Sequence, residues 1–99
     1  MKLIKAELSS FQGRLPIYLS VENSEIQISM NLDDGNNGQM LYDHLKLALD
    51  FDGNVISLES ATDGLDSRSI TVKFNNISEM VKYLKYHGLN IALTKIIET

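Results

Sequence analysis

The stretch IYLSVENSEIQISMNL, residues 17–32, alternates apolar and polar side chains on both sides of a central Asn23-Ser24. A period of two is typical of a strand with one buried face, so we predict two strands joined by a two-residue turn. In that register residues of one kind face each other across the hairpin: Val21 and Ile26, Leu19 and Ile28, Ile17 and Met30, with the like-charged Glu22 and Glu25 beside the turn. An antiparallel hairpin is therefore the starting point of the predicted fold.

The stretch LKLALDFDGNVISLES, residues 45–60, alternates in the same way around Asp52-Gly53. Asp-Gly favours a type I′ turn, so we predict a second hairpin with these facing pairs: Leu49 and Ile56, Leu47 and Leu58, Lys46 and Glu59. The oxygen side chains of Asp50 and Asp52 also suggest a calcium loop. An EF-hand loop that begins at Asp50 needs glycine at its sixth position and glutamate at its twelfth, where this chain has Val55 and Ala61. The turn is the interpretation we favour, and calcium binding is the alternative.

The residues just before this second hairpin fit two structures. Gln, Met, Leu, Lys and Ala all favour helix, which makes a helix over 39–48 a reasonable alternative. The regular alternation of the hairpin instead favours strand from about residue 44. Residues 39–43 are left open between helix and strand.

After Asn76 the apolar period changes to three and four, which predicts a helix over about 77–87. Asn76 can cap its first turn, with Glu79 three residues later as in a capping box. Gly88 supplies the left-handed residue that ends many helices, and Leu89 can close the last turn. The apolar stripe of this helix consists of Ile77, Met80, Val81 and Leu84.

Shorter alternating runs predict further strands at residues 3–8, 70–74 and 91–97. Strands followed by a helix and a last strand indicate an α+β domain. We predict a single domain over residues 1–99, with a mostly antiparallel, curved sheet of about six or seven strands and one helix packed on one face.

Composition narrows the classes of function. The chain has 99 residues, no cysteine and a net charge of −4. The absence of cysteine fits a cytoplasmic protein, and we expect neither a signal peptide nor membrane association. The negative charge argues against direct nucleic-acid binding, since such proteins neutralise phosphates with Lys and Arg.

Motifs for catalysis are missing. His44 and His87 lack the spacing of metal ligands, so we expect surface or capping roles for both. No serine lies in a Gly-x-Ser-x-Gly elbow, and the glycines form neither GxGxxG nor a P-loop. We therefore predict no enzyme, no catalytic residue, no metal and no cofactor.

Tyrosines and acidic loops are the candidate partner-binding residues. On a helical wheel Tyr83 and Tyr86 lie away from the apolar stripe, on the outer half with Glu79 and Lys82. Outward tyrosines are frequent interface anchors, although the pair could instead lean over the sheet and cover the core. Tyr18 and Tyr42 are also expected on polar faces. The acidic candidates lie in two polar loops: Asp33 and Asp34, and Asp63 and Asp66.

In its small size, acidity and lack of cysteine and catalytic motifs, the chain resembles phage-encoded inhibitors of bacterial defence and toxin-neutralising immunity proteins. That resemblance implies a non-enzymatic inhibitor that blocks a functional, basic surface of another protein. A structural or self-associating protein, such as a virion component or a homodimer that pairs an edge strand, is the first alternative. A small-ligand or calcium-binding module at residues 50–54 is the second.

Overall fold

A computed structural model of the protein describes residues 2–34, 37–61 and 66–98. The described residues form six strands, two α-helices and one short 3-10 helix. In chain order these are β1 (Lys2–Ser10), β2 (Gly13–Glu22), β3 (Glu25–Asn31), η1 (Leu32–Asp34), α1 (Gly38–Phe51), β4 (Val55–Ala61), β5 (Ser67–Lys73), α2 (Ile77–Tyr86) and β6 (Asn90–Glu98).

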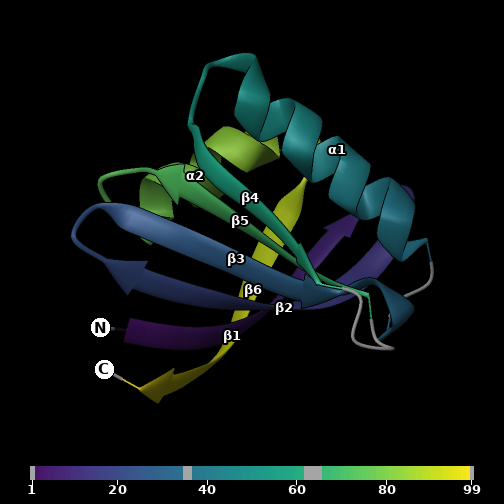
Figure 1. The fold of residues 1–99 in the computed structure, drawn as a ribbon, viewed down its shortest axis with the longest axis horizontal. Helices are drawn as coiled ribbons and strands as arrows, with labels where there is room; N and C mark the ends of the chain where they lie inside the picture. The colour runs from purple at the N-terminus through teal and green to yellow at the C-terminus, as the bar shows by residue number, and fades with distance from the viewer. Residues whose placement is uncertain (1, 35–36, 62–65, 99) are drawn as a thin grey trace.

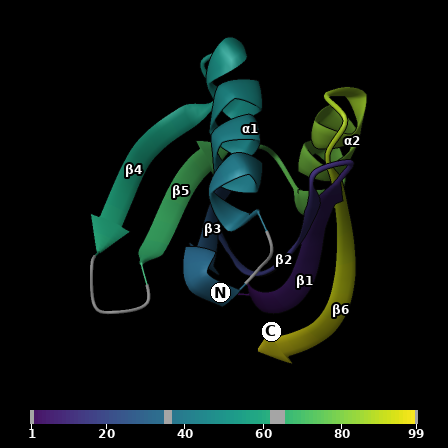
Figure 2. The same cartoon turned by 90° about the vertical axis from the view of Figure 1, so that its right-hand side faces the viewer.

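The six strands form one antiparallel sheet in the order β4-β5-β3-β2-β1-β6. The sheet curves, and both helices lie on its concave side (Figures 1 and 2). Helix α1 packs over β2 and β1, whereas α2 packs against β6. The predicted α+β class, the curved antiparallel sheet and the helix near 77–87 are confirmed, but the prediction of a single helix was wrong.

The β2–β3 hairpin has the predicted register. Its pairs include Val21 with Ile26 and Glu22 with Glu25 at the turn. Asn23 and Ser24 have φ angles of 50° and 64°, the positive values that a type I′ turn needs at both central positions. Ile26 and the other inward apolar residues of this hairpin are buried except Val21, which is partly buried against the core.

Helix α2 also has the predicted ends. The side chain of Asn76 accepts a hydrogen bond from the Glu79 backbone N–H at 2.9 Å. At the other end Gly88 has a φ of +84°, and the Leu89 N–H donates to the Leu84 carbonyl at 2.9 Å. These bonds satisfy backbone groups that a helix end otherwise leaves unpaired.

The predicted hairpin over 45–60 was wrong, because residues 38–51 form helix α1. The open question over residues 39–43 is thereby settled as helix. Asp52-Gly53 ends this helix instead of joining two strands. The Gly53 N–H donates to the Asp50 carbonyl, the Asn54 N–H donates to the Leu49 carbonyl, and Gly53 has a φ of +68°. This pair of bonds is the Schellman motif, and the same motif ends α2 at Gly88.

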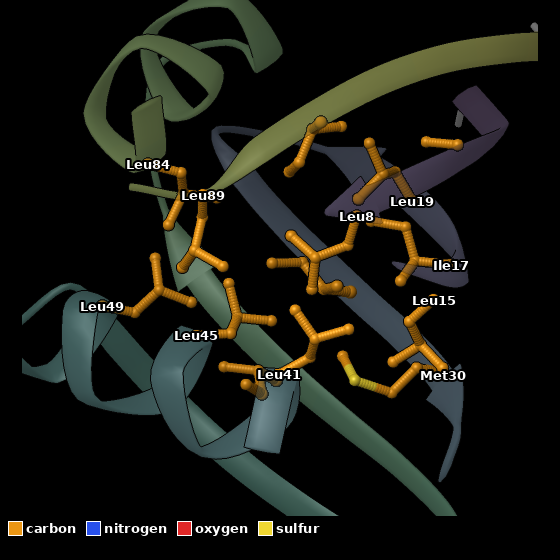
Figure 3. Packing of buried hydrophobic residues seen from close by; sticks show 14 of the residues in the cluster. Leu8, Leu15, Ile17, Leu19, Met30, Leu41, Leu45, Leu49, Leu84 and Leu89 are labelled. Carbon is orange, nitrogen blue, oxygen red and sulfur yellow. The ribbon is translucent and has the colours of Figure 1, made fainter. Parts of the chain in front are cut away.

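Burial of apolar side chains explains why this segment forms a helix and not a strand. Residues spaced three and four apart reach the core from α1: Leu41, Tyr42, Leu45, Ala48 and Leu49. Figure 3 shows Leu41, Leu45 and Leu49 pointing from α1 into the core, with Leu49 on the side of Leu84 and Leu89 and Leu41 on the side of Met30. Burial of Tyr42 contradicts its predicted place on a polar face, whereas Tyr18 is exposed as predicted.

Gly38 fixes the start of α1. A Cβ atom on this glycine would lie 2.6 Å from the Leu32 carbonyl oxygen, so the helix begins in direct contact with η1. Neither α1 nor α2, the two α-helices of the described residues, is long and apolar enough to cross a membrane.

Candidate protein-binding groove

An open groove of about 600 Å³ lies between the C-terminal end of α1 and the outer face of α2. We call it the aromatic groove. Its lining residues are Phe51, Asp52, Phe74, Glu79, Lys82, Tyr83, Tyr86 and His87. The structure therefore brings together the four partner-binding candidates predicted on the helix. It adds Phe51 from the end of α1 and Asp52 just after it, which the sequence suggested only as part of a calcium loop.

Helix α2 places its candidates on one face by their spacing. Glu79, Lys82, Tyr83 and Tyr86 follow one another at intervals of three, one and three residues, so they share the outer side of the helix. Met80 and Leu84 lie on the opposite side and are fully buried in the core. The burial of these two residues fixes the rotation of α2 and so turns the candidate side chains toward the groove.

Tyr83 forms the floor of the aromatic groove. Its ring packs 5.5 Å from that of Phe74 and 4.7 Å from that of His87, and its hydroxyl donates to the Ala48 carbonyl in α1. Burial, followed by the nearby negative charge of Asp52, raises the pKa of the Tyr83 phenol, which keeps it protonated as a donor. Tyr83 thus partly covers the core, as in the alternative considered for this pair, and it links the two helices.

Phe51 and Tyr86 form the rim of the groove. The two residues are 77% and 92% exposed, and their ring centroids lie 6.1 Å and 6.2 Å from that of His87. Large aromatic side chains with this much exposure leave a hydrophobic surface in contact with water. The rim is therefore the part of the groove that is free to contact another molecule.

The two histidines have structural roles. His44 Nε2 lies 2.9 Å from the His87 carbonyl oxygen. Because a carbonyl can only accept, Nε2 is the protonated nitrogen and His44 caps the end of α2. His87 is the C-cap residue of the same helix. Among the described residues, no group of three or more His, Cys, Asp or Glu could hold a metal ion.

Asp33 and Asp66, two acidic candidates that the structure describes, do not line the aromatic groove. Asp33 is exposed in η1, beside the N-terminal end of α1, and Asp34 follows it in the same turn. The groove lies at the other end of this 14-residue helix, roughly 20 Å away. Asp66 instead pairs with Arg68, whose guanidinium lies 5.8 Å from the centre of the Tyr42 ring. Asp63 lies outside the described residues.

A second exposed apolar region on α1 was missed by the sequence analysis. Met40, Leu47 and Phe51 line the side of α1 that carries His44, and their exposures exceed two fifths. Met40 and Leu47 border a smaller hollow of about 430 Å³ with Phe11, from the turn between β1 and β2. The spacing of residues 40, 44, 47 and 51 by three and four is the signal for this face, and it is visible only when the segment is treated as helix.

Together these residues form one band of exposed apolar side chains. It runs from Phe11 along α1 to Phe51 and across the aromatic groove to Tyr86. A surface of this kind suits contact with another macromolecule. Comparison of the chain with known protein families, with curated proteins and with solved structures gave no match.

Proposed function

We propose that this protein is a non-enzymatic binding protein that acts by covering a functional surface of another protein. The observation that supports the proposal is the band of exposed apolar side chains that ends in the aromatic groove, with Phe51 and Tyr86 at its rim. Aromatic side chains are the most frequent anchors of protein interfaces, because they bury a large area with few rotatable bonds.

Charge suggests the kind of partner. The chain carries a net charge of −4. Three acidic residues, Asp43, Asp52 and Glu79, line the two hollows of the band, against one cation, Lys82. Acidic groups at the edge of an apolar contact favour the approach of a basic surface and raise the association rate more than the affinity. The expected partner is therefore a protein with a basic functional surface, and the expected activity is inhibition of the phage anti-defence or toxin-immunity kind.

A comparison of two tyrosine variants tests the proposal. Tyr86→Ala removes an exposed rim residue, whereas Tyr18→Ala removes a tyrosine exposed on a strand of the sheet, outside the band. Proteins captured from cells of the source by the tagged wild-type chain would be purified and titrated by calorimetry. We expect Tyr86→Ala to weaken binding about tenfold or more and Tyr18→Ala to leave it unchanged.

The same purified partner allows a test of inhibition. The partner's activity should fall as wild-type protein is added. It should fall much less when the same amount of the Tyr86→Ala variant is added instead. Equal binding of the partner by a folded Phe51→Ala/Tyr86→Ala double variant would contradict the assignment of this surface. Binding without any effect on the partner's activity would contradict inhibition.

A further inference from the structure

Strand β4 is an open edge of the sheet. Within the described residues it pairs only with β5, so the outward backbone N–H and C=O groups of β4 have no strand beside them. The pairing with β5 is irregular between Val55 and Ser57 and regular from Ser57 to Ala61. A regular run of backbone groups at an edge is a template for another strand.

The side chains of β4 are also poorly covered. Leu58 pairs with the buried Ile70 of β5 and so faces the core side of the sheet, yet it is 49% exposed. Helix α1 packs over β2 and β1, and α2 packs against β6, which leaves β4 at the far side of the sheet from α2 (Figure 2). Ile56 is equally exposed. Strand β4 therefore presents both free backbone groups and apolar side chains.

The opposite edge, β6, differs in ways that discourage pairing. It carries Lys95 near its middle, and its register with β1 shifts twice. Lysine and bulges are the devices by which proteins protect edge strands. Strand β4 has one such irregularity, at its start between Val55 and Ser57, and its sequence, VISLESA, has neither lysine nor proline. Of the two edges, β4 is thus the one suited to strand addition.

We propose that β4 pairs with β4 of a second copy of this chain, antiparallel, across a two-fold axis at Leu58. Within the regular run the pairs that result are Leu58 with Leu58 and Ser57 with Glu59, and the irregular start of β4 lies beside Ser60 and Ala61 of the other copy. Glu59 is the one charged residue of the strand, and in this register it faces a hydroxyl group. An axis at Glu59 would place two carboxylates directly opposite each other, which is unfavourable, and an axis at Ser57 or Ser60 would place Glu59 opposite the apolar Val55 or Ala61. Charge thus selects Leu58, and a two-fold contact closes at the dimer.

Matched substitutions on the two edges test the interface. Leu58→Lys places two ammonium groups opposite each other at the axis, whereas Leu93→Lys makes the same change on β6, where Leu93 is 52% exposed and pairs with the buried Ala6. By sedimentation equilibrium we expect a wild-type dimer with a dissociation constant in roughly the micromolar range. Leu58→Lys should weaken it about tenfold or more, and Leu93→Lys should not change it.

Oxidative cross-linking tests the register itself. The chain contains no cysteine, so an introduced one can pair only with its copy. Directly opposed residues of an antiparallel pair have Cα atoms about 4.5–5.5 Å apart, within the range of a disulfide. Leu58→Cys should therefore cross-link readily. In Glu59→Cys the two Cα atoms would be about 8 Å apart, too far for a disulfide, and that variant should cross-link poorly.

Several outcomes would overturn the inference. One is a wild-type protein that is monomeric at concentrations on the order of 1 mM. Another is a dimer that survives Leu58→Lys but is lost with Leu93→Lys or with Phe51→Ala/Tyr86→Ala, since it would lie on β6 or on the aromatic groove. Efficient cross-linking of Glu59→Cys with none of Leu58→Cys would refute the axis. None of these outcomes depends on the partner proposed above.

Discussion

Residues 17–32 and 45–60 have the same alternation of apolar side chains on both sides of a two-residue turn sequence, yet they fold differently. The first is the β2–β3 hairpin, whereas the second is the end of α1 followed by β4. In both, the residues at the bend have positive φ: Asn23 and Ser24 in the hairpin, and Gly53 at the end of the helix. A residue that favours positive φ therefore marks a change of direction without specifying the elements on either side of it.

The difference lies in which residues alternate. The inward positions of the hairpin include the β-branched Ile17, Ile26 and Ile28, which suit strands. Residues 39–51 contain no β-branched residue and consist largely of helix formers. Leu45 and Leu49 satisfy both periods at once, since they are four residues apart. Of the three leucines at 45, 47 and 49, only Leu47 separates the two structures, because a strand buries it and a helix exposes it.

Two alanine substitutions in α1 test whether this segment is helix or strand. Of the stability changes predicted below, theirs includes the largest. Leu45 is fully buried in α1, whereas Leu47 is 72% exposed. Leu45→Ala should lower the free energy of unfolding by about 2–5 kcal/mol, because it removes buried methyl groups and leaves a cavity. Leu47→Ala should change it by no more than about 0.5 kcal/mol. Urea unfolding followed by circular dichroism measures both. Similar losses from the two changes would restore the strand interpretation.

The same contrast explains how much of the molecule could be predicted. The hairpin and α2 were predicted with their registers and ends, because each has one dominant period and its own turn or cap residues. The α2 side of the aromatic groove followed from the helical wheel. The place of Phe51 and Asp52 in the groove could not be predicted, because they reach it only when residues 38–51 are helical. The distance between Asp33 and the groove follows from the length of α1, so it could not be predicted while the second half of this segment was interpreted as strand.

Tyr83→Phe provides a second, smaller test of the helical segment. The hydroxyl of Tyr83 donates to the Ala48 carbonyl, a contact that requires the last turns of α1 to pack beside α2. Its loss should cost about 1 kcal/mol of the free energy of unfolding at neutral pH. Amide hydrogen exchange should also become faster in the last turn of α1. If stability and exchange both stay at wild-type values, the contact does not hold the two helices together.

Measuring the free energy of unfolding of the wild type and of Tyr83→Phe at alkaline pH tests the direction of the Tyr83 pKa shift. Burial and the charge of Asp52 raise the pKa of Tyr83 in the folded state above the ordinary value of about 10. The folded state then holds the phenolic proton more tightly than the unfolded state. Its contribution to stability is complete below about pH 10 and is lost as pH rises through the folded pKa. The advantage of the wild type over Tyr83→Phe should therefore shrink above about pH 10, and an advantage that grows there would contradict the raised pKa.

Substitutions at the two bends, Ser24→Gly and Gly53→Ala, have the smallest expected effects. They test the backbone conformation at each bend. Ser24 has a φ of 64°, where a side chain costs about 1–2 kcal/mol, so Ser24→Gly relieves that cost. Glycine also gives the unfolded chain more freedom, which offsets about 0.4–1 kcal/mol of the gain. The net expectation is a stabilisation of a few tenths to about 1 kcal/mol. Gly53→Ala should do the reverse and destabilise by about 1 kcal/mol through φ alone, since no atom lies within 4 Å of the added Cβ. Thermal unfolding of both variants measures the pair, and a destabilising Ser24→Gly would mean that the Ser24 side chain makes a contact that outweighs its backbone strain.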